Sequence, residues 1–187
     1  MSFQSTPWQT VGPYYRLGLE PLYRTDIAPA SALGERVEVR GQVFDGTGLP
    51  VSDAVLEIWQ ADAKGIYAHA EDPRRDDHDT AFDGWGRVPT DENGRFAFST
   101  IKPGSVAGPG GRAQAPHLVV LVFMRGLLRA ASARLYFSDE PRNAEDPILL
   151  LVPAERRGTL LAQAQGDGLY HWNVHMQGPD ETVFFDY

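Results

Sequence analysis

The sequence predicts an all-β protein, built as a two-sheet β-sandwich with an extended N-terminal arm and at most one or two short helices. Short runs of β-branched and aromatic residues recur along the chain, separated by many of its 19 glycines and 14 prolines. Hydrophobic residues make up 42% of the 187 residues, which is enough to bury a core. Only one segment has the pattern of a helix.

The chain divides where the first clear strand pattern begins. Residues 1–34 lack periodicity but carry several aromatic rings among prolines, so we expect an arm that packs on the body or on a partner chain. Residues 35–187 contain the alternating runs and form the expected sandwich domain. Because residues 1–11 are polar, no signal peptide is expected, and a cytoplasmic location follows as an expectation.

The expected strands of the first half follow from alternation and from turn residues. Valines alternate in residues 37–44, which end at an Asp-Gly-Thr-Gly turn. Residues 54–60 place apolar groups on both faces, which indicates an inner strand. A further strand is expected at 84–88, and Phe96 and Phe98 share one face of another at 95–100.

In the second half, residues 103–116 form a long loop rich in glycine and proline, whose length suggests a function. The apolar run at 118–123 predicts the central strand, followed by strands at 132–137, 169–176 and 182–185. Residues 155–165, after Pro153, are the single helix candidate.

Charge and composition exclude several classes of protein. The net charge is −8 and the pI about 5.0, so nucleic acid is not an expected partner. The chain has no cysteine, which rules out disulfides and thiolate metal sites. The longest apolar run, residues 118–124, is too short to cross a bilayer, so no membrane association is expected.

Among the five histidines, only His117 suggests a special position. His69 and His78 flank a charged loop, and His171 and His175 alternate away from an apolar strand face, so all four are expected at the surface. His117 begins a buried strand directly after the long loop. It is either a histidine at the edge of the core or a ring presented into a cleft, and no second ligand lies nearby in the sequence.

Three segments, taken together, resemble the intradiol ring-cleaving dioxygenases. They are residues 56–67 (LEIWQADAKGIY), residues 90–104 with TDENG and TIKPG, and residues 115–117 (APH). Residues 10–14 (TVGPY) and 178–187, with TVFFD, are similar to the α-type chain of a two-chain enzyme in that family. The resemblance covers nearly the whole sequence.

The resemblance also implies where the metal lies. Catalytic chains of that family hold Fe(III) with two tyrosinates and two histidines, and those positions fall on Tyr67, Val106, His117 and Val119 here. Valine cannot donate to a metal, and Gln114 stands where catalytic chains carry an arginine. The resemblance therefore implies no cofactor on this chain and Fe(III) on a homologous β chain, paired with it as α–β units in a larger oligomer.

The same resemblance implies that this chain lines its partner's substrate pocket. The positions that carry this role are Arg125, Thr10, Gly12, Pro13 and Tyr14. The implied substrates are protocatechuate (3,4-dihydroxybenzoate) and O2, in aromatic catabolism through the β-ketoadipate pathway, and a guanidinium would attract the substrate carboxylate. Two alternatives are a stand-alone β-sandwich binding module and a self-sufficient iron dioxygenase, which would need ligands that the sequence lacks.

Overall fold

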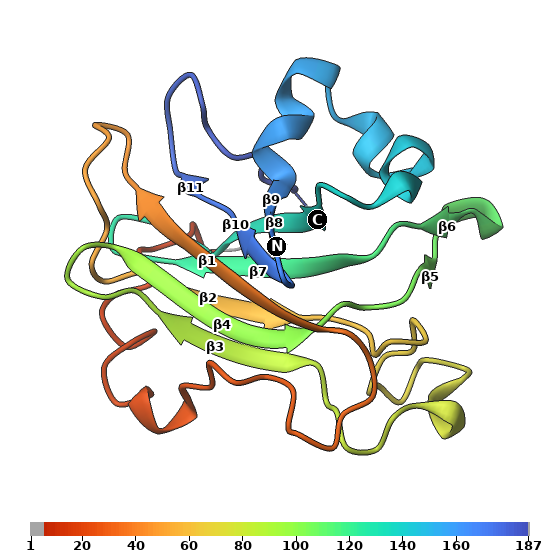
Figure 1. The fold of residues 1–187 in the computed structure, drawn as a ribbon. Coiled ribbons are helices and arrows are strands. Elements are labelled where there is room, and N and C mark those ends of the chain that lie inside the picture. The colour runs from red at the N-terminus through yellow and green to blue at the C-terminus, as the bar shows by residue number, and fades with distance from the viewer. Residues whose placement is uncertain (1–5, 187) are drawn as a thin grey trace, which may run out of the picture.

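The computed structural model describes residues 6–186, and it confirms a mostly β architecture (Figure 1). The strands are β1 (Arg36–Phe44), β2 (Val55–Trp59), β3 (Trp85–Pro89), β4 (Arg95–Ile101), β5 (Val106–Ala107), β6 (Ala113–Gln114), β7 (His117–Phe123), β8 (Ala131–Phe137), β9 (Leu161–Gly166), β10 (Leu169–His171) and β11 (Val174–His175). The short 3-10 helices are η1 (Glu20–Leu22), η2 (Arg75–Asp77), η3 (Pro109–Gly111), η4 (Pro141–Glu145), η5 (Leu149–Leu151) and η6 (Ala154–Leu160).

Nine strands form one sheet that folds over to make two layers. The order is β11-β1-β10-β9-β8-β7-β2-β3, with β4 paired to β1, while β5 and β6 form a separate hairpin. Figure 1 shows β1 and β4 crossing over β2 and β7. Alternate residues of β1 are buried, and side chains from both layers, such as Val39 and Phe98 on one and Leu56 and Leu118 on the other, meet in a single apolar core.

The central strand of the prediction is confirmed. β7 lies between β2 and β8 and is antiparallel to both. A second, smaller apolar cluster lies beneath η5 and η6, where Leu149, Val152 and Leu160 pack on Tyr136. Together the two clusters fix β7 and β8, the strands on which His117 and Arg134 lie.

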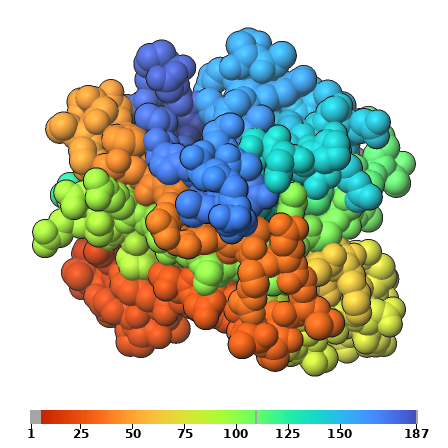
Figure 2. Space-filling model, in the orientation of Figure 1, coloured from red at the N-terminus to blue at the C-terminus, as the bar shows by residue number. Residues whose placement is uncertain are grey.

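The N-terminal arm lies along the body, red to orange in Figure 2. Backbone bridges join Arg24 to Arg87 of β3 and Asp26 to Ser99 of β4, and Ile27 is fully buried in the main core. Residues 1–5 lie outside the described residues. The division into an arm of residues 1–34 and a domain of residues 35–187 stays a prediction.

Three elements differ from the sequence prediction. The helix candidate 155–165 is a 3-10 helix only as far as Leu160, and then becomes β9, because residues from 161 pair in parallel with β8. The strand at 169–176 divides into β10 and β11, which both pair with β1 around the Trp172-Asn173 break. Residues 182–185 make an isolated bridge from Phe185 to Ser132 instead of a strand. Tertiary pairing thus overrides local pattern in all three.

The long glycine- and proline-rich loop has structure of its own, since it contains η3 and the β5–β6 hairpin. Among the described residues, no helix has both the length and the apolar character needed to cross a membrane.

Candidate functional site

The four positions that would correspond to iron ligands are not gathered in one cavity. Tyr67 and Val106 line a surface pocket of about 600 Å³, whose other lining residues are Trp59, His69, Glu71, Asp72, Pro73, Arg74 and Ala107. The Tyr67 ring stacks on Trp59 at 5.9 Å between centroids. His117 and Val119 do not line this pocket.

His117 belongs to the core edge, which is one of the two interpretations left open by the sequence. Its side chain is buried, and its Nδ1 lies 2.8 Å from the carbonyl oxygen of Ala115. Since a carbonyl only accepts, Nδ1 carries the proton when the ring is neutral. Burial, aided by the nearby Arg134 cation, lowers the pKa of His117 to about 4. The ring is therefore neutral at physiological pH and is held by a structural hydrogen bond.

A guanidinium lies close to Val119, the position at which catalytic chains carry their second histidine ligand. Arg134 is the cross-strand partner of Val119, and its Nη1 donates to Gln114 Oε1 at 2.6 Å. It also lies 3.4 Å from the Tyr136 hydroxyl. A fixed positive charge at this point repels a metal cation. With two valines in place of donors as well, these residues do not fit a ferric ion.

Beside His117 lies a buried polar network that the sequence analysis missed. Asp146 is fully buried, accepts from the Tyr136 hydroxyl at 3.1 Å and from the backbone N–H of Ala115 at 2.7 Å. Burial is the main cause that raises the pKa of Tyr136. The network joins β8 to the loop before β7, so its role is structural. Across residues 6–186, no group of three or more His, Asp or Glu side chains could hold a metal.

The second predicted site is assembled at one pocket. A cavity of about 430 Å³ is lined by Thr10, Gly12, Pro13, Tyr15, Arg16, Leu17, Asp53 and Arg125. Four of the five predicted substrate-binding residues are therefore neighbours, although Arg125 lies more than a hundred positions from the others in the sequence. Tyr14 does not line the cavity, and its side chain is 77% exposed.

The arm reaches this pocket through specific contacts with the sheet. The N–H of Val11 donates to the carbonyl of Leu127 at 3.1 Å, which joins the arm to the β7–β8 turn that carries Arg125. Gly12 follows with a φ of +65°, a conformation that favours glycine. Arg16 Nη1 donates to the carbonyl of Ser52 at 2.6 Å. These bonds fix the Thr10–Pro13 backbone at the cavity that Arg125 also lines.

Tyr15 and Asp53 complete the pocket, and sequence analysis did not identify either of them. The Tyr15 ring stacks on Phe123, and its hydroxyl donates to Asp53, at 2.8 Å to the carbonyl and 3.1 Å to Oδ2. Asp53 Oδ2 lies 3.5 Å from Arg125 Nε. Burial, followed by the Asp53 charge, raises the pKa of Tyr15 to about 12, so its hydroxyl remains a donor. No pattern in the sequence marks these contacts.

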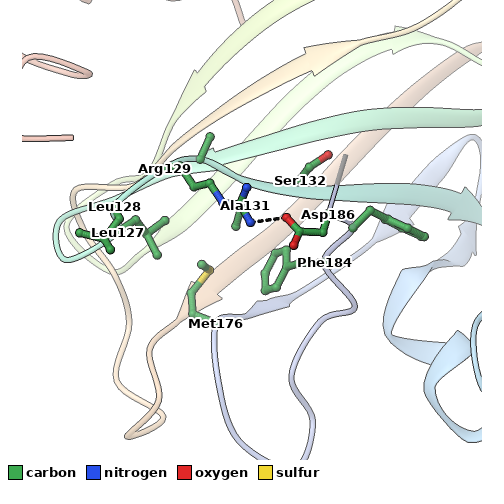
Figure 3. A pocket seen from close by; sticks show the side chains of 10 residues that line it. Leu127, Leu128, Arg129, Ala131, Ser132, Met176, Phe184 and Asp186 are labelled. Atoms are coloured by element: carbon green, nitrogen blue, oxygen red, sulfur yellow. Dashed lines mark hydrogen bonds and ion pairs between the residues drawn. The ribbon is translucent and has the colours of Figure 1, made fainter. Parts of the chain in front are cut away.

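A third pocket, of about 500 Å³, is lined in part by residues of the β7–β8 turn (Figure 3). Its apolar walls come from Leu127 and Leu128 of the turn and from Met176 and Phe184. The drawn bond joins Arg129 to Asp186 across it. Because its only charged side chains are this pair, the pocket offers little to orient a small polar ligand.

Comparison with known proteins places these features in context. The Dioxygenase family model matches residues 12–165. The α chain of protocatechuate 3,4-dioxygenase from Burkholderia cepacia is 46% identical, over 99% of this chain and 98% of the relative. The β chain from the same organism is 34% identical, over 86% and 72% respectively. An intradiol ring-cleavage dioxygenase structure from Tetranychus urticae superposes with a TM-score of 0.65, at 21% identity, over 92% of this chain and 94% of that one.

The buried His117 should make the protein less stable in mild acid. Its pKa is about 4 in the folded chain against an ordinary 6.5, so between these values the unfolded chain binds a proton that the folded chain excludes. Stability therefore falls as the pH falls, by about 2 kcal/mol between pH 7 and pH 5 from this group alone. Urea titrations at both pH values measure the loss.

The control is His117→Gln, whose loss over the same pH range should be smaller by about 2 kcal/mol, since the titrating ring is absent. Equal losses in the two proteins would show that the ring is not buried in its neutral form. NMR titration of the wild-type ring supplies the same answer if the variant folds poorly.

Proposed function

This chain belongs to the family of the intradiol ring-cleaving dioxygenases, and on that premise we propose that it is the α subunit of a protocatechuate 3,4-dioxygenase. The complete enzyme converts 3,4-dihydroxybenzoate and O2 to 3-carboxy-cis,cis-muconate, a cytoplasmic step of aromatic catabolism in the β-ketoadipate pathway. This subunit holds no iron and forms part of the pocket for a homologous, iron-bearing β chain.

One observation carries the proposal, namely the kind of side chain at each ligand position. Tyr67 and His117 remain, but Val106 and Val119 cannot donate. His117 Nδ1 donates a hydrogen bond to a backbone carbonyl, and the Arg134 cation lies nearby. Both features suit a structural role for this region and do not suit metal binding. A ferric ion on the partner would bind and activate the catechol, so the chemistry of the metal belongs to the other chain.

The contribution of this subunit is the pocket at Arg125. The guanidinium side chain is 75% exposed, so it can reach a ligand bound by another chain. A substrate carboxylate at the guanidinium gains a charge-assisted hydrogen bond, which contributes about 1.5–3 kcal/mol. Thr10, Gly12 and Pro13 line the same cavity, and limit where the aromatic ring can lie.

Several exposed apolar side chains of this chain favour the presence of a partner chain. Trp8 and Tyr14 are both more than two-thirds exposed, and Leu17 and Leu128 are also exposed. Large exposed apolar side chains are typical of a surface that another protein covers. The similarity to both α and β chains of protocatechuate 3,4-dioxygenase suggests an α–β heteromer. The partner would then close the pocket and exclude water from it.

Ring cleavage should require both chains. The purified chain, supplied with iron, 3,4-dihydroxybenzoate and O2, is expected to give no ring-opened product, because it cannot assemble the metal site. Adding the β-type chain encoded by the same genome should restore both product formation and O2 uptake. Product formation by this chain alone would contradict the proposal, as would an unchanged rate when it is added to the β-type chain.

Arg125 should contribute more to the turnover of a substrate that carries a carboxylate than to that of one without it. In the two-chain enzyme, Arg125→Ala is expected to lower kcat/KM for 3,4-dihydroxybenzoate by roughly 10- to 100-fold, which corresponds to the loss of one charge-assisted hydrogen bond. Catechol has no carboxylate, so its kcat/KM should change much less. Arg95→Ala, at an exposed arginine of β4 outside this pocket, is the matched control. Equal losses for the two substrates would remove the carboxylate role.

A further inference from the structure

Asp53 lies at the junction of all the parts of the Arg125 pocket. It lies in the turn that precedes β2, and it lines the same cavity as Thr10 and Pro13. Its Oδ2 contacts Arg125 Nε on one side and accepts from the Tyr15 hydroxyl on the other. We propose that Asp53 is a positioning residue, which orients Arg125 to receive the carboxylate of the substrate. This inference rests on the proposed function.

The geometry of the ion pair determines which edge of the guanidinium is available. The ion pair joins Asp53 Oδ2 to Arg125 Nε, at 3.5 Å, and neither Nη of Arg125 donates a hydrogen bond within residues 6–186. A carboxylate binds a guanidinium best through two parallel hydrogen bonds along one edge. With Nε engaged, the edge formed by the two Nη atoms is left for an incoming carboxylate.

Asp53 is itself held in one orientation. The Tyr15 hydroxyl donates to both the side chain and the backbone carbonyl of Asp53, and the Tyr15 ring is fixed by stacking on Phe123. The backbone of Arg125 also hydrogen-bonds the Tyr15 hydroxyl. Tyr15 therefore connects the arm, Asp53 and the β7–β8 turn, so a displacement of one of them moves the others.

The cost of this arrangement suggests that it is not simply structural. Asp53 Oδ1 is buried, and it has no hydrogen-bond partner among the described residues. Leaving a buried polar atom unpaired is unfavourable, and a role in positioning Arg125 is one explanation for keeping a carboxylate here. The charges that face Asp53 are those of Arg125 and Arg16, which line the same cavity. A neutral side chain would lower this cost but would hold the Arg125 cation less strongly than a carboxylate does.

The test is a double-mutant cycle in the two-chain enzyme. Asp53→Ala should raise KM for 3,4-dihydroxybenzoate by about three- to tenfold with little change in kcat, because an exposed ion pair orients a side chain only modestly. KM for catechol should stay the same. In an Arg125→Ala background the Asp53→Ala change should have no further effect on either substrate.

A merely structural role would give a different result. It would raise KM for both substrates together, and it would persist in the Arg125→Ala background. Either outcome overturns the proposal. Asp53→Asn keeps the size and an acceptor oxygen, so it should recover part of the loss, and thermal melting of each variant separates misfolding from misplacement.

A second measurement keeps this inference apart from the proposed function. In the isolated full-length chain, NMR relaxation of the Arg125 Nε–H should report an ordered side chain in the wild type and a mobile one in Asp53→Ala. Equal mobility would overturn the positioning role even if the two-chain enzyme is active. If the enzyme is inactive with any partner while the Nε–H still loses order, the proposed function fails and the positioning role stands.

Discussion

The buried guanidinium of Arg87 joins the N-terminal arm to the sheet, and the pocket at Arg125 depends on that junction. Arg87 lies on β3 with 3% of its surface exposed, donates to Glu57 of β2 and to the carbonyl of Tyr15, and packs over the Phe123 ring. The Glu57 side chain is 24% exposed, so removal of one partner should cost less than the roughly 3–5 kcal/mol typical of a fully buried pair. Without Arg87, the arm would lose one of its polar anchors, at Tyr15, and Thr10 to Pro13 would depend on the remaining bonds of Val11 and Arg16.

The two candidate sites therefore have different physical characters. Around His117 the polar groups satisfy one another, with Asp146 bonded to Tyr136 and to backbone amides and Arg134 bonded to Gln114. Such a network stiffens the fold and leaves no ligand positions. Around Arg125 the guanidinium is exposed and only partly paired. The characters of the two sites are consistent with a division of roles, in which the partner chain supplies the metal and this chain recognises the carboxylate.

The sequence predicted the strands where alternation and burial agree, as in β1, β4 and β7. It was wrong where pairing decides. The end of the helix predicted at 155–165 forms β9, whose first two residues pair with β8, and the interrupted β10 and β11 both pair with β1. The sequence left two alternatives for His117, a position at the core edge or a ring in a cleft. The pattern of residues along the chain cannot show that Arg134 lies nearby. The residues of the Arg125 pocket came from family resemblance alone. Tyr15 and Asp53 were missed because their contact joins positions 38 residues apart.

The most direct test of this account is the iron content of the chain by itself. The chain is purified alone, incubated with iron under reconstituting conditions, separated from free metal, and analysed for bound iron and for visible tyrosinate-to-iron absorption. The account predicts almost no bound iron and no such absorption, while the β-type partner treated in parallel acquires both. An iron atom held stoichiometrically by this chain would contradict it.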